Sequence, residues 1–95
     1  VDLTHYTIKW TDQNFRIFDM EPGTPIAVDS HRKFFDPLAL DVIDATYASA
    51  VGRGEPWDVE LPATTQSGRS IWIRSAGHAE FEKGLPVRLV GVLQD

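Results

Sequence analysis

Apolar and polar side chains alternate with a period of two through most of the last third of the chain, residues 57–95. The alternating apolar positions are Trp57, Val59, Leu61 and Ala63, then Ile71 and Ile73, then Val87, Leu89 and Leu93. Such alternation predicts half-buried strands, and glycine-containing turns at 66–69 and 82–84 divide it into three. We therefore predict antiparallel strands over Trp57–Ala63, Ser70–Phe81 and Pro86–Gln94. One face of this sheet is apolar and needs a cover.

The residues before this sheet are candidates for the cover. Four short elements are predicted there, namely strands over Val1–Leu3 and Thr7–Trp10 and helices over Gln13–Phe18 and Pro25–Ser30. Thr11 or Asp12 can cap the first helix, because a side-chain oxygen at this position accepts from free backbone N–H groups. The Thr24-Pro25 pair predicts the start of the second helix, since proline favours the first helical position. Residues 31–35 are expected to be irregular, with two phenylalanines as anchors.

The Asp36-Pro37 pair is the third helix-start signal, and it opens the longest predicted helix, which runs to about Val51. Apolar side chains at helical spacing follow it, namely Leu40, Ile43, Tyr47 and Val51. The Gly52-Arg53-Gly54 sequence ends the helix. The predicted order of elements is β-β-α-α-α-β-β-β, which indicates an α+β domain with helices on one face of an antiparallel sheet.

Composition excludes several classes of function. The chain has 95 residues, enough for one domain, and we expect residues 1–95 to be a single module from a longer protein. It has no cysteine, which excludes disulfides and cysteine chemistry. The net charge of −5 argues against nucleic acid as a partner. No apolar run is long enough for a membrane span and no signal peptide is visible, so we expect no membrane insertion of this domain. The expected location is the cytoplasm, either free or as the cytoplasmic part of a membrane-bound sensor.

Short motifs occur along nearly the whole chain in a characteristic order. They are Trp10-Thr11-Asp12, Phe15-Arg16-Ile17-Phe18, Pro22-Gly23, Phe35-Asp36-Pro37, Gly54-Glu55-Pro56-Trp57, Glu60, Gly68-Arg69-Ser70-Ile71-Trp72-Ile73 and the run from Gly84 to Asp95. No single motif is specific, but their order and spacing together resemble a PAS domain with a PAC-type C-terminal half. The resemblance implies a five-stranded antiparallel sheet in the spatial order 2-1-5-4-3, with helices on one face. Pro62 fits this order, because proline belongs on an edge strand.

The resemblance also implies a role. PAS domains are sensory or dimerisation modules of bacterial signalling proteins, and they regulate an attached effector such as a histidine kinase or a diguanylate cyclase. Asp95 resembles the first residue of the Asp-Ile-Thr signature with which such domains pass into a signalling helix. We therefore expect signal output through Asp95 to a C-terminal effector domain. The domain itself is expected to be non-catalytic, because no nucleophile–base pair or phosphate-binding loop is present.

The predicted inner face of the sheet and the facing side of the long helix indicate the candidate ligand pocket. The pocket candidates are Ile43, Tyr47, Leu61, Ile73, Ser75, Leu89 and Leu93. Only Ser75 and Tyr47 carry polar atoms, so a ligand would be small and mostly apolar. The alternative is that these side chains only fill the core, and that the domain is a structural dimerisation module with no ligand.

A bound cofactor is not expected. Haem-binding relatives usually take their axial histidine from the long helix, whereas His5, His31 and His78 all lie outside it and are expected on the surface. Light-sensing relatives need a cysteine and inner-face amides for flavin, and here Ala63, Ile73 and Leu93 stand at such amide positions. No metal site is indicated either. A cofactor-bound redox or gas sensor is the third alternative, and an absorption spectrum would distinguish it from the others.

Three apolar side chains are predicted on the outer face of the sheet, where a simple exposed face would be polar. They are Trp72, Val90 and Val92. A tryptophan with two valines on the neighbouring strand suggests that something covers this face. We therefore expect a homodimer that associates through it.

Overall fold

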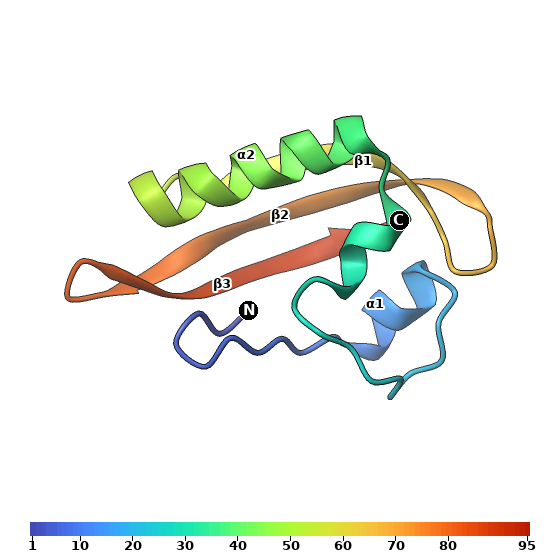
Figure 1. The fold of residues 1–95 in the computed structure, drawn as a ribbon, viewed down its shortest axis with the longest axis horizontal. Coiled ribbons are helices and arrows are strands. Elements are labelled where there is room, and N and C mark those ends of the chain that lie inside the picture. Colours follow the sequence, from blue (N-terminus) through green and yellow to red (C-terminus); the bar gives the residue numbers. More distant parts are fainter.

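The computed structural model describes residues 1–95 and has three helical segments on one face of a three-stranded antiparallel sheet (Figure 1). The elements are α1 (Asp12–Ile17), a 3-10 helix η1 (Ser30–Phe34), α2 (Pro37–Arg53), β1 (Trp57–Thr64), β2 (Ser70–Glu82) and β3 (Leu85–Gln94). The sheet order is β1-β2-β3. The α+β class and the three C-terminal strands are thus confirmed, and each strand extends one residue beyond its predicted bounds.

The two predicted N-terminal strands appear only as isolated bridges, from Asp2 to Thr7 and from Asp2 to Arg88, so the structure does not show the predicted five-stranded order. Residues 1–3 lie beside β3, where the Leu3 amide donates to Val87 and the Leu89 amide donates to Val1, but they form only isolated bridges. Residues 8–10 leave the sheet. Trp10 instead packs its ring on those of Phe15 and Phe18, at centroid distances of 5.2 and 5.6 Å. This aromatic ring is half-buried against α1. Residues 8–10 therefore do not form the ladder hydrogen bonds of a second strand.

The position of β1 at the edge of the sheet explains why this strand can contain a proline. Pro62 lies opposite Trp72 of β2, and β1 has no neighbour on its other side. Proline has no N–H to donate to a ladder, so it is tolerated on a strand with one free edge. The prediction that this strand is an edge is confirmed.

The short helices differ from the prediction in two respects. Thr11 caps α1 through its hydroxyl, which accepts from the Asn14 amide at 3.2 Å. No helix forms over residues 25–30, because the Thr24 hydroxyl donates to the Glu21 carbonyl at 2.6 Å instead of capping a helix. The 3-10 helix η1 lies where irregular chain was expected, and it buries Phe34.

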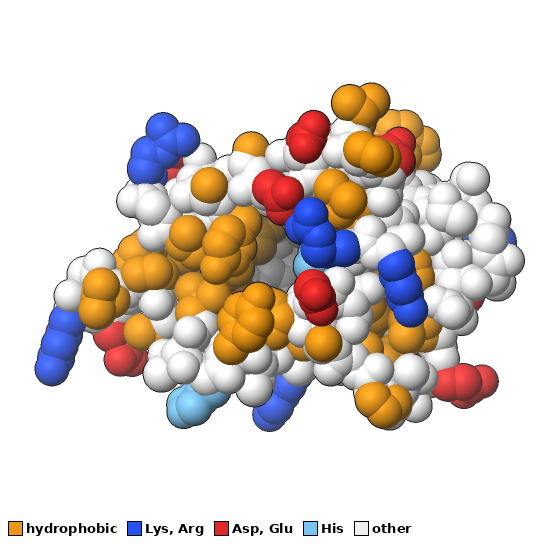
Figure 2. Space-filling view, viewed as in Figure 1, with side chains coloured by type: hydrophobic (Ala, Val, Ile, Leu, Met, Phe, Trp, Pro, Cys, Tyr) orange, Lys and Arg blue, Asp and Glu red, His pale blue; other side chains and the backbone are white.

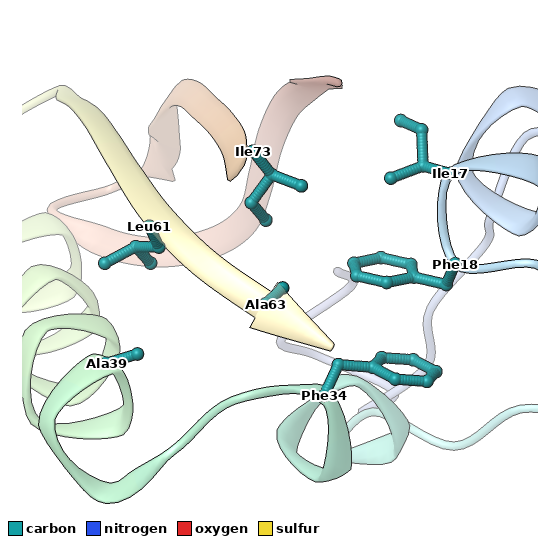
Figure 3. Packing of buried hydrophobic residues seen from close by; sticks show 7 residues of the cluster. All are labelled: Ile17, Phe18, Phe34, Ala39, Leu61, Ala63 and Ile73. Carbon is teal, nitrogen blue, oxygen red and sulfur yellow. The ribbon is translucent and has the colours of Figure 1, made fainter. Parts of the chain in front are cut away.

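The core lies at one end of the sheet, where α1, η1 and the start of α2 meet the strands (Figure 3). Its buried members are Ile17, Phe18, Phe34, Ala39, Leu61, Ala63 and Ile73. The rings of Phe18 and Phe34 stack at a centroid distance of 4.4 Å and an interplanar angle of 7°. The two phenylalanines join α1 to η1 beneath the sheet.

Away from this core, α2 is held off the sheet. It runs along β1 and β2 (Figure 1), yet Ala39 and Ala50 are its only fully buried residues. The larger apolar side chains that follow helical spacing along α2 are less buried than expected, and Tyr47 is 46% exposed. The space between helix and sheet is therefore incompletely filled.

Asp36→Ala is expected to lower the free energy of unfolding by about 1 kcal/mol, the usual cost of losing an N-cap. The Asp36 carboxylate accepts from the Ala39 amide at 2.9 Å and opens α2 as predicted. Urea denaturation followed by circular dichroism measures the change. Asp41→Ala is the control, because Asp41 is an exposed residue of the same helix outside the cap. Equal urea midpoints for the two variants would show that the Asp36 cap does not stabilise the protein.

Candidate ligand cavity

A cavity of about 480 Å³ lies between the inner face of the sheet, α2 and the N-terminal segment. Figure 2 shows hydrophobic side chains gathered around a hollow near the centre of the molecule. The lining contains 24 residues, of which 18 are hydrophobic. The size and the apolar lining are those of a small-molecule site.

All seven predicted pocket candidates line this cavity. They are Ile43, Tyr47, Leu61, Ile73, Ser75, Leu89 and Leu93. Leu61 and Ile73 are buried and also belong to the core, whereas Ser75, Leu89 and Leu93 are half-buried. The structure therefore brings together residues from α2 and from all three strands around a single space.

The indole of Trp57 defines one end of the inner face. It lies across Gly77 of β2 and Gly91 of β3, which face each other in the sheet. A methyl group on Gly77 would approach the indole to 2.6 Å, and one on Gly91 would approach it to 3.0 Å. Only glycine therefore leaves room for the tryptophan on these two strands.

Ser75 supplies a polar group on the otherwise apolar inner face. The Trp57 Nε1–H donates to Ser75 Oγ at 3.0 Å, and Ser75 lies between Val59 and Leu93 on the neighbouring strands. Because the hydroxyl oxygen accepts this bond, its own hydrogen is available to a third partner. Ser75 can thus donate one hydrogen bond into the cavity.

Several lining residues were missed by the sequence analysis. The polar ones are Lys9, Asn14, His31 and Thr46, and the aromatic ones include Trp10 and Phe35. The alternation that revealed the sheet could not reveal most of these, because they lie on irregular chain or on short helices. The aromatic residues before α2 were the one available signal, since so many large rings require burial.

His31 was expected on the surface, and this was wrong. It is half-buried, borders the cavity and contacts Phe35 edge-on at a centroid distance of 6.3 Å. Burial lowers the pKa of His31 below its ordinary value, although a hydrogen bond to the Val28 backbone acts in the opposite direction. Burial therefore favours the neutral form of the imidazole. His5 and His78 are exposed, as expected.

The outer-face residues are exposed but do not form one continuous patch. Trp72 is 65% exposed and Val92 is 63% exposed. Trp72 lies opposite Pro62, whereas Val92 lies opposite Ala76, four residues further along β2. The side chain of Arg74 points outward between them and pairs with Asp58 at 2.8 Å. Val90, opposite His78, continues the second patch.

Asp95 follows β3 and is exposed. Its charge is one of those that raise the pKa of Arg69, after the larger effect of the Asp19 carboxylate. Arg69 binds Asp19 through two hydrogen bonds of 2.9 and 2.8 Å, which hold the pKa of that carboxyl well below its usual range. The charge at the end of β3 thus acts on the ion pair between Arg69 of the β1–β2 turn and Asp19 of the turn that follows α1.

No group of three or more histidine, aspartate or glutamate side chains lies close enough together to hold a metal ion. None of the helices combines the length and the apolarity that crossing a membrane would require.

Comparison with known proteins defines the fold. No protein-family model and no curated protein matches the chain. A sensory box histidine kinase/response regulator from Burkholderia thailandensis superposes on 99% of this chain and 71% of its own, with a TM-score of 0.82 and 23% identity. The N-terminal domain of a diguanylate cyclase with PAS/PAC sensor from Marinobacter aquaeolei covers 100% of this chain and 89% of its own, with a TM-score of 0.84 and 16% identity.

The PAS domain of a protein from Colwellia psychrerythraea is also similar, with a TM-score of 0.76 and 21% identity over 99% of this chain and 80% of its own. The antiparallel sheet with helices on one face places the chain in the α+β class. Within that class, the fold is the PAS fold that the sequence motifs predicted.

Proposed function

We propose that this PAS-fold domain is a sensory module that binds a small, mostly apolar molecule in the inner cavity and regulates an attached effector. The observation that carries the proposal is the cavity of about 480 Å³ between α2 and the sheet. A domain that used these side chains only as a core would close this space, since protein interiors are close-packed. The sensor and cyclase names of the similar structures support a signalling role.

The path from the cavity to the effector is short. Leu89 and Leu93 of β3 line the cavity, and β3 ends one residue before Asp95. A ligand that changes the packing of α2 on these leucines acts directly on the strand that leads into the effector. Signal output through Asp95 belongs to this proposal.

Ile43→Trp is expected to abolish ligand binding, because the indole would occupy the space that Ile43 borders from α2. Val42→Trp is the matched control, since Val42 is the preceding residue of α2, is 41% exposed and does not line the cavity. Octan-1-ol is the probe, and its binding is followed through the fluorescence of Trp10 and Trp57, which both line the cavity. At least a tenfold loss of affinity in Ile43→Trp alone supports the proposal.

Native mass spectrometry of freshly purified protein complements this titration. A co-purified small molecule that is retained by Val42→Trp and lost from Ile43→Trp would identify the natural occupant. The absence of any bound molecule, together with no response to octan-1-ol in the parent protein, would favour a structural role instead.

A second candidate function is dimerisation through the outer face of the sheet, favoured by the exposure of Trp72 and Val92. Burial of apolar surface contributes about 25 cal/mol per Å². A two-fold axis would present the same two patches from both copies, so each Trp72 could cover the partner's valines. The ion pair between Arg74 and Asp58 would then lie inside the interface.

Trp72→Glu is expected to weaken self-association at least tenfold without altering the fold, because a carboxylate would replace the largest apolar side chain of the outer face. Leu38→Glu is the control, since Leu38 is 78% exposed on α2, away from the outer face of the sheet. Sedimentation velocity over a range of concentrations measures both variants. Association of Trp72→Glu at the parental strength would exclude this interface.

A further inference from the structure

The cavity lining is free of acidic side chains although the protein as a whole is acidic. The chain carries 14 aspartates and glutamates and a net charge of −5, yet none of the acidic residues lines the cavity. The one lysine in the lining is Lys9. The cavity therefore disfavours anions less than the acidic remainder of the molecule does, and the only charged side chain in its lining is positive.

Lys9 has no ionic partner in the protein. All the ion pairs of the structure are made by arginines or by His5, and none involves Lys9. Its side chain is exposed, whereas the neighbouring Ile8 and Trp10 are half-buried and also line the cavity. Lys9 is thus an exposed lysine without an ionic partner on the rim of a largely apolar cavity.

A second polar residue, Asn14, also lines the cavity. It precedes Phe15 on α1, and the ring of Phe15 packs on Trp10 at 5.2 Å. The amide side chain of Asn14 lines the cavity and forms no hydrogen bond with another residue. The lining therefore contains an ammonium and an amide N–H that can donate to a hydrogen-bond acceptor.

We propose that the natural occupant is a monocarboxylate with an apolar body, a refinement that rests on the proposed ligand-binding function. The carboxylate would lie at the rim against Lys9 and Asn14, and the apolar body would lie on the inner face of the sheet. A volume of about 480 Å³ equals that of roughly 16 water molecules in the liquid, so an aliphatic or aromatic acid of roughly ten to fifteen non-hydrogen atoms fits.

The interior excludes a second charge. The other polar side chains of the lining are the Ser75 and Thr46 hydroxyls, the Tyr47 phenol and the imidazole of His31, whose pKa is lowered by burial. None of them is a fixed positive charge, and a second carboxylate among them would lose its hydration without gaining a counter-ion. A dicarboxylate or a cationic amphiphile is thus disfavoured, whereas one carboxylate at the rim keeps contact with water.

Octanoate, octan-1-ol and octylamine test the proposal, because they share one apolar chain and differ in the charge of the head group. Calorimetric titration at pH 7.4 and low salt is expected to give the order octanoate, octan-1-ol, octylamine. Lys9→Gln should weaken octanoate binding about threefold to fivefold, the effect of one solvated ion pair. It should leave octan-1-ol binding unchanged, and Lys9→Arg should retain the preference for octanoate.

Lys83→Gln is the matched control, because Lys83 is an exposed lysine of the β2–β3 turn and does not line the cavity. It is expected to bind all three probes as the parent does. Equal binding of octanoate and octan-1-ol, unaffected by Lys9→Gln, would overturn the proposal and leave the ligand-binding function intact. If the parent protein binds none of the three probes, the ligand-binding function itself fails.

Discussion

Phe18→Ala is expected to lower the free energy of unfolding by about 3–5 kcal/mol, the usual cost of removing a buried phenylalanine ring. Phe18 is 1% exposed and stacks on Phe34 at 4.4 Å. It also contacts Trp10, which the N-terminal segment contributes to the core. The substitution therefore removes the ring through which three separate segments pack together.

Phe81→Ala is the control for this measurement. Phe81 lies near the end of β2 and is 40% exposed, so its loss is expected to cost about 1 kcal/mol or less. Urea denaturation followed by circular dichroism compares the two variants with the parent. A loss below about 1.5 kcal/mol for Phe18→Ala would mean that the neighbouring rings collapse into the vacated space.

Gly77→Ala is the second large effect, with an expected loss of about 3 kcal/mol, at the upper end of the usual cost of overpacking. A methyl group there would lie 2.2 Å from the Val90 carbonyl oxygen and 2.7 Å from the Gly91 Cα. Both are backbone atoms of β3, so relief requires the strands to separate. The indole of Trp57, at 2.6 Å, would also have to move.

The matched control is Gly52→Ala. Gly52 lies in the last turn of α2, and a methyl group there would meet nothing within 4 Å. Alanine favours helix over glycine by up to about 1 kcal/mol, so this variant is expected to be at least as stable as the parent. The thermal unfolding midpoint measures the stability of both variants. Similar midpoints for Gly77→Ala and Gly52→Ala would contradict the close contact between β2 and β3.

Much of the fold could be predicted from local patterns. The alternation from Trp57 onward determined three strands and identified their inner face, because strand residues alternate between faces whatever covers them. The cap at Asp36 was equally local, since the carboxylate binds an amide three residues away. The seven pocket candidates followed from these two elements, and all of them line the cavity.

The local sequence pattern gave the wrong conformation in two segments, residues 7–10 and 24–30. Residues 7–10 alternate as a strand would, but burial of Trp10 against Phe15 and Phe18 outweighs the hydrogen bonds of an edge strand. Residues 24–30 carry a helix-start signal, but the Thr24 hydroxyl forms a turn with the Glu21 carbonyl. In both segments a side-chain contact that the hydrophobic pattern and the capping signals do not reveal decided the conformation.

By itself, the sequence determined the strands, their inner face and the longest helix, because each depends on residues within a few positions of one another. Only the tertiary structure decided the size and polarity of the cavity. The cavity exists because α2 is held off the sheet, and the separation depends on side chains from several segments at once. Lys9 and His31 line it because aromatic contacts bring their segments there, and such contacts leave no periodic signal in the chain.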